Sequence, residues 1–96
     1  MSAFSPPPLV DFGNFASVRS AGEQYLAESV GERAVVDLTG LESCNSIAVA
    51  LLMAWFRFAH ARGQEVVYAG APQDLLSIIE ISGLMEVLPL SSDAAG

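Results

Sequence analysis

The sequence predicts an open α/β sheet, at least partly parallel, with helices packed against it. Two short β-branched runs, Arg33–Leu38 and Glu65–Ala69, are typical of strands that fill a sheet. Longer stretches with apolar residues at helical spacing alternate with these runs, which indicates an α/β fold. The chain has 96 residues, 52% of them hydrophobic, enough for one small core. We therefore expect a single domain over residues 1–96.

The part of the chain before the first strand is expected to hold one helix. Residues 1–8 include three consecutive prolines and predict a loose start, because proline lacks an amide donor and favours extended geometry. The next stretch, Leu9–Phe12, is sufficient for a short edge strand at most. Apolar residues then recur at helical spacing over Asn14–Ser29, and we expect Gly31 to stop this helix.

The longest helix is expected over Ser46–Arg62, with Gly63 as its stop. Its first part, Ile47–Phe56, carries no charge, and its apolar residues cover more than one face. Such a helix is either sandwiched between layers or exposes a patch for a partner.

A third helix is expected from Pro72 to about Ser82, followed by a final edge strand at Glu86–Leu90 and a frayed tail over residues 91–96. Only two strands are strong, and so small a sheet rarely stands alone. Either the N-terminus supplies a weakly signalled strand, or a partner or a second copy of the chain completes the sheet edge. The side chains of the third helix that we expect to face inward are Leu75, Leu76, Ile78 and Ile79.

The charge pattern excludes several classes of function. The net charge is −7, and the basic residues are four scattered arginines and one histidine, which argues against nucleic acid as a partner. The uncharged run Ile47–Phe56 is about half the ~20 residues that span a bilayer, so we expect no direct membrane insertion. The N-terminus has no signal-peptide pattern, which predicts a cytoplasmic protein. Without a P-loop, a GxGxxG motif or a metal-spaced cluster, we expect no cofactor, no metal and no enzymatic activity.

Three short motifs carry a resemblance to a known family. Asp37-Leu38-Thr39 ends the first strand, Asn45-Ser46-Ile47-Ala48 begins the longest helix, and Ile81-Ser82-Gly83-Leu84 ends the third helix. In this order the chain resembles the STAS family, named for sulfate transporters and anti-sigma factor antagonists, over Val35 to Leu90. It looks most like the small STAS subunit of Mla-type phospholipid ABC transporters.

The resemblance implies a STAS-like open mixed sheet with helices packed against it, whose N-terminal strands are shortened or missing. It also implies a non-enzymatic subunit that binds and stabilises the cytoplasmic ATPase of a phospholipid-transporting ABC complex, for maintenance of outer-membrane lipid asymmetry. Such a subunit is peripheral to the inner membrane through its partner. The alternative is an anti-sigma factor antagonist regulated by phosphorylation at Ser46. A nucleotide-binding role finds no phosphate cradle in the sequence.

The resemblance places the partner-binding residues at the start of the longest helix, residues 43–48, which we call the junction. Asn45 stands where the family often has an aspartate, which favours holding a partner over a phosphorylation switch. Each junction residue also has a structural reading, because Asn45 and Ser46 are good helix caps and Cys44 is a small packing residue. The predicted contact residues are Ser43, Cys44, Asn45, Ser46, Ile47 and Ala48.

Other side chains along the longest helix have a structural or a docking role. Of Met53, Trp55, Phe56 and Phe58 we expect two to be buried and one or two to face a partner. We expect His60, near the helix end, to be solvated or to complement the helix dipole, and Asp37 to bond loop amides.

Overall fold

The computed structural model describes residues 3–29 and 33–91 and contains three helices and three strands. The helices lie within a residue or two of their predicted bounds. The stop predicted at Gly31 and the tail after Ser91 lie outside the described residues. In chain order the elements are α1 (Phe15–Glu28), β1 (Ala34–Asp37), α2 (Ser46–Ala61), β2 (Val66–Ala69), α3 (Gln73–Ile81) and β3 (Leu90–Ser91).

The three strands form one sheet in the order β1-β2-β3, and both pairs are parallel. Among the described residues the sheet is therefore parallel, which confirms the expected parallel pairing, whereas the resemblance implied a mixed sheet. Val36 of β1 pairs with Tyr68 of β2, and Tyr68 pairs with Leu90 of β3. The order places β2 in the centre, where buried and half-buried residues alternate along the strand.

The final strand is much shorter than predicted. Only Leu90 and Ser91 pair with β2, whereas the predicted strand Glu86–Leu90 is mostly a turn. The amides of Val87 and Leu88 both donate to the Leu84 carbonyl, so they are not available to the sheet.

The segment predicted to be loose is attached to the sheet, and the predicted edge strand at Leu9–Phe12 is absent from the described structure. Phe4 lies beside β1 as an isolated parallel bridge to Val36; its amide donates to Val35 and its carbonyl accepts from Asp37. Its ring stacks on Tyr25 and meets the edge of Trp55, with centroids 5.7 and 5.5 Å away. One alternative for completing the sheet was a weakly signalled strand from the N-terminus. The N-terminal segment instead supplies a single bridging residue, Phe4.

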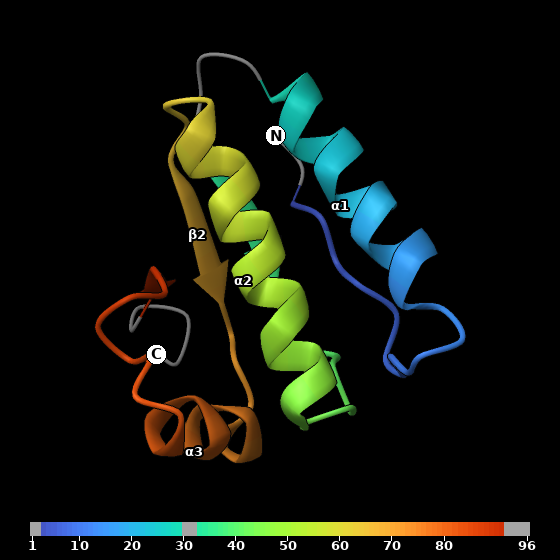
Figure 1. Ribbon diagram of the computed structural model, residues 1–96, viewed down its shortest axis with the longest axis vertical. Helices are drawn as coiled ribbons and strands as arrows, with labels where there is room; N and C mark the ends of the chain where they lie inside the picture. The colour runs from blue at the N-terminus through green and yellow to red at the C-terminus, as the bar shows by residue number, and fades with distance from the viewer. Residues whose placement is uncertain (1–2, 30–32, 92–96) are drawn as a thin grey trace.

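Helices α1 and α2 lie side by side, and α3 lies at the end of the molecule where α2 begins (Figure 1). The Trp55 indole fastens α2 to α1, because its Nε1 donates to the Arg19 carbonyl at 3.0 Å. Gly22 lies against this ring, and a Cβ there would overlap the indole. The close approach of the two helices therefore depends on a glycine at that position.

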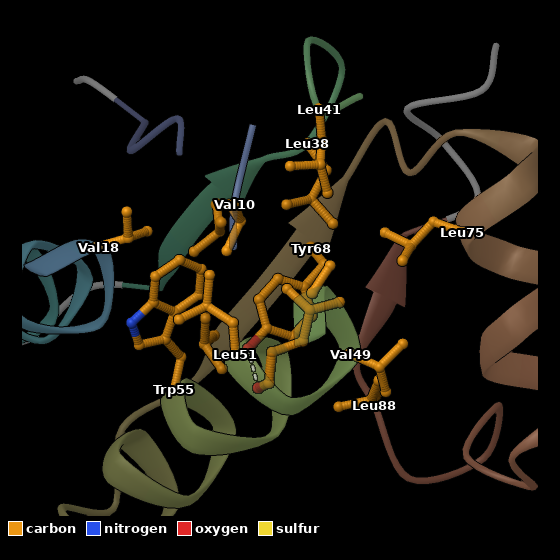
Figure 2. Packing of buried hydrophobic residues seen from close by; sticks show 14 of the residues in the cluster. Val10, Val18, Leu38, Leu41, Val49, Leu51, Trp55, Tyr68, Leu75 and Leu88 are labelled. Carbon is orange, nitrogen blue, oxygen red and sulfur yellow. Dashed lines mark hydrogen bonds between the residues drawn. The ribbon is translucent and has the colours of Figure 1, made fainter. Parts of the chain in front are cut away.

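The core lies between α2 and the sheet. Figure 2 shows Tyr68 of β2 pointing at α2, where its hydroxyl donates to the Leu52 carbonyl. Burial raises the pKa of Tyr68, so it stays a neutral hydrogen-bond donor. From α3, Leu75 and Ile79 are fully buried as predicted, whereas Leu76 and Ile78 are only half-buried.

Candidate functional site

The junction begins with a capped helix start. Asn45 has extended backbone angles, and its Oδ1 accepts a hydrogen bond from the Ala48 amide at 3.0 Å. This is the N-cap arrangement, in which a side-chain oxygen takes one of the unpaired amides of the first turn. The prediction that Asn45 is a cap is confirmed, and the cap fixes the direction of the residues that follow it.

Ser46 is the first residue of α2 and is exposed. Its hydroxyl makes no hydrogen bond within residues 3–29 and 33–91, so Ser46 is not the cap. The positive end of the α2 dipole lies at this position, and no acidic residue occupies the first turn. An exposed hydroxyl at a helix start can donate to or accept from a partner, and it is accessible to a modifying enzyme.

Ser43 faces inward to the N-terminal segment. Its Oγ accepts from the Val10 amide at 2.7 Å, and its own amide donates to the Pro8 carbonyl at 3.0 Å. The Glu42 amide donates to the same carbonyl at 2.8 Å. The proline-rich segment thus supports the loop that leads into α2, and Ser43 positions the junction from within.

The remaining junction residues lie at or below the surface. Ala48, one of the predicted contact residues, is 1% exposed, so its side chain belongs to the core. Cys44 and Ile47 are half-buried and pack against the core. Burial raises the pKa of the Cys44 thiol, and the nearby Asp74 carboxylate raises it further. A thiol with a raised pKa is a poor nucleophile, which agrees with a packing role.

Two exposed neighbours of Ser46 were missed from the sequence. Ala50 lies four residues later in α2 and therefore on the same face, and it is exposed. Helical spacing from Ser46 could have indicated it. Glu42 is exposed at the other side, in the loop before the cap. The exposed residues of the junction are therefore Asn45 and Ser46, and Glu42 and Ala50 are exposed just before and just after it.

Asp37 organises the loop that follows β1. Its Oδ1 accepts from the Thr39 hydroxyl at 2.6 Å and from the Thr39 amide at 3.0 Å, as the sequence led us to expect. These two bonds, the hydroxyl first, lower the pKa of the Asp37 carboxyl. Gly70, after β2, lies against Thr39 with a φ of +70°, a conformation that disfavours a side chain. The carboxylate is thus a structural acceptor in the turn.

The large side chains in the second half of α2 are less buried than predicted. Only Trp55 is fully buried, while Met53, Phe56 and Phe58 are half-buried. The Phe56 ring stacks on His60 at 5.8 Å. His60 is exposed in the last turn of α2, where a cation complements the helix dipole, as expected.

The described residues offer no group of three His, Cys, Asp or Glu side chains that could hold a metal ion. None of the helices in residues 3–29 and 33–91 has the length and apolar character needed to cross a membrane. What the junction presents is a fixed backbone with polar side chains, which suits recognition.

The comparison with known proteins identifies the family. The family model described as "Mlab, STAS domain" matches residues 10–89, which include every helix, β1, β2 and the whole junction. No curated protein matches the chain significantly. STAS domains are generally interaction domains without catalytic activity. Three helices on a three-stranded parallel sheet are consistent with that fold. The chain therefore belongs to the MlaB-like STAS domain family.

Proposed function

We propose that this chain is a non-enzymatic subunit that binds and stabilises the cytoplasmic ATPase of a phospholipid-transporting ABC complex, and so serves outer-membrane lipid asymmetry. Membership of the MlaB-like family supports the class of partner. In this proposal the chain is cytoplasmic and is held at the inner membrane by the ATPase, since no helix of its described part could anchor it.

The observation that carries the proposal is the exposed hydroxyl of Ser46 on a rigid helix start. The Asn45 cap and the Ser43 contacts fix the backbone on both sides of it. Rigid contact residues bind with little loss of conformational entropy. Docking of this surface onto one conformation of the ATPase shifts the ATPase towards that conformation, and no bond is made or broken.

Co-purification tests the proposal. The tagged chain should recover the ATPase of the lipid transporter when it is exposed to the full set of cytoplasmic ABC ATPases of its own cell. Replacing Ser46 by arginine should abolish recovery, because a long charged side chain would be forced into the contact. Recovery of no ATPase, or full recovery by the Ser46→Arg chain, would refute it.

The same exposed hydroxyl favours one alternative, an anti-sigma factor antagonist that is released when Ser46 is phosphorylated. A phosphate at Ser46 would be stabilised by the α2 dipole, so the fold would tolerate it and the charge would act on the partner. Incubation with the anti-sigma kinases of the cell and ATP, followed by intact mass measurement, decides between the two. Added phosphate that is lost in Ser46→Ala favours the antagonist, and an unchanged mass removes it.

A further inference from the structure

The end of α3 and the turn after it carry exposed apolar side chains that lie outside the junction. Ile81, the last residue of α3, is 86% exposed, and Met85 and Val87 in the following turn are 44% and 43% exposed. Three large apolar side chains are thus exposed within seven residues of the chain, and a cluster of exposed apolar side chains is typical of an interaction site. We call Ile81, Met85 and Val87 the α3 patch.

The backbone beneath the α3 patch is firmly held. The Gly83 amide donates to the Glu80 carbonyl and the Leu84 amide to the Ile79 carbonyl, both at 3.0 Å. The Leu88 amide closes the next turn onto the Leu84 carbonyl at 3.0 Å, and the Leu88 side chain is buried. The inward leucines thus anchor the turn, and a ligand would meet a preformed surface at low entropic cost.

The charge around the α3 patch is of one sign. Glu80 and Glu86 are exposed, and neither forms an ion pair within the described residues. From residue 63 to residue 96 the sequence contains no Lys, Arg or His. The last arginine, Arg62, lies at the C-terminal end of α2, and Figure 1 shows that end on the far side of the molecule from α3. An approaching surface therefore meets apolar side chains framed by unpaired carboxylates.

This combination determines what the patch can bind. We propose that the α3 patch is a second docking surface, which takes a protein segment that carries aliphatic side chains flanked by Lys or Arg. An anionic bilayer or a nucleic acid would be repelled by Glu80 and Glu86. A second copy of the chain would bring the same acidic surface or another part of a molecule of charge −7. A basic amphipathic segment can pack its aliphatic side chains on the α3 patch and pair its Lys or Arg side chains with the two carboxylates.

The test uses the full chain, labelled with ¹⁵N, and a synthetic amphipathic helix made of leucine and lysine. The peptide should shift the amide signals of residues 80–88. Ile81→Ser should weaken binding about tenfold, because one buried aliphatic contact is lost without a change of charge. The matched control is Phe12→Ser, since Phe12 is 88% exposed at another part of the surface. The control should bind as the unaltered chain does.

Three outcomes would overturn the proposal. Equal affinity of the Ile81→Ser and Phe12→Ser chains would show that the patch makes no specific contact. Equal binding of a leucine and glutamate peptide would remove the acidic contribution. Association of the free chain through residues 80–88 at rising concentration would assign the patch to a second copy. Ile81 is so exposed that its replacement should leave the fold intact, which circular dichroism checks.

Discussion

Asn45 and Ser46 are adjacent in the chain but contribute differently. The Asn45 side chain closes the first turn of α2, whereas the Ser46 hydroxyl has no partner in the described structure. The sequence predicts polar residues at this helix start, but Ser43, Asn45 and Ser46 are all good caps by type. The Ser43 hydroxyl instead accepts from the Val10 amide, 33 residues earlier in the chain, and so distant a contact leaves no local sequence pattern.

Replacing the two residues separately should distinguish these roles. Asn45→Ala should lower the free energy of unfolding by about 1 kcal/mol, because an amide of the first turn loses its acceptor. Ser46→Ala should change it by less than about 0.5 kcal/mol, as for most surface positions. Urea denaturation measures both, with Asn45→Asp as the variant that keeps the cap. A Ser46→Ala loss as large as that of Asn45→Ala would contradict the assignment.

The elements were predicted well where periodicity is strong and poorly where pairing is short. The three described helices and the strands β1 and β2 follow the sequence pattern, because each buries a regular set of side chains. The bridge at Phe4 and the two-residue strand at Leu90 are too short to show alternation. The packing of Gly22 against the Trp55 ring could not be predicted from the sequence either, because a glycine does not indicate which side chain lies against it.

The contact between α1 and α2 gives a prediction at this scale. Gly22→Ala should favour the helix by about 1 kcal/mol but place a methyl group in the Trp55 ring, where overpacking costs about 1–3 kcal/mol. Because the ring is fully buried, we expect the upper end of that cost and a net loss of about 2 kcal/mol. Ser20→Ala, at an exposed site of α1, is the control for urea denaturation and should lose less than about 0.5 kcal/mol. A Gly22→Ala chain more stable than the natural one would refute the close packing.

At the scale of the molecule, the two docking surfaces that we propose are separate. The junction offers polar groups at the start of α2, and the α3 patch offers apolar side chains among carboxylates. The resemblance indicated the first, although Ser43 and Ala48 turn inward. Composition alone does not reveal the second, because the sequence of α3 does not show which of its apolar residues are buried in the fold and which stay exposed. Completion of the sheet edge by a second copy remains a prediction.

The affinity of the purified chain for the lipid-transporter ATPase is the most direct test of the central claim. Titration calorimetry should give a saturable complex, weakened at least tenfold by Ser46→Arg because the added side chain cannot be accommodated in the contact. Ser20→Arg adds the same charge at an exposed site on α1 and should bind like the natural chain. If Ser46→Arg binds as tightly as Ser20→Arg, the start of α2 is not the docking surface.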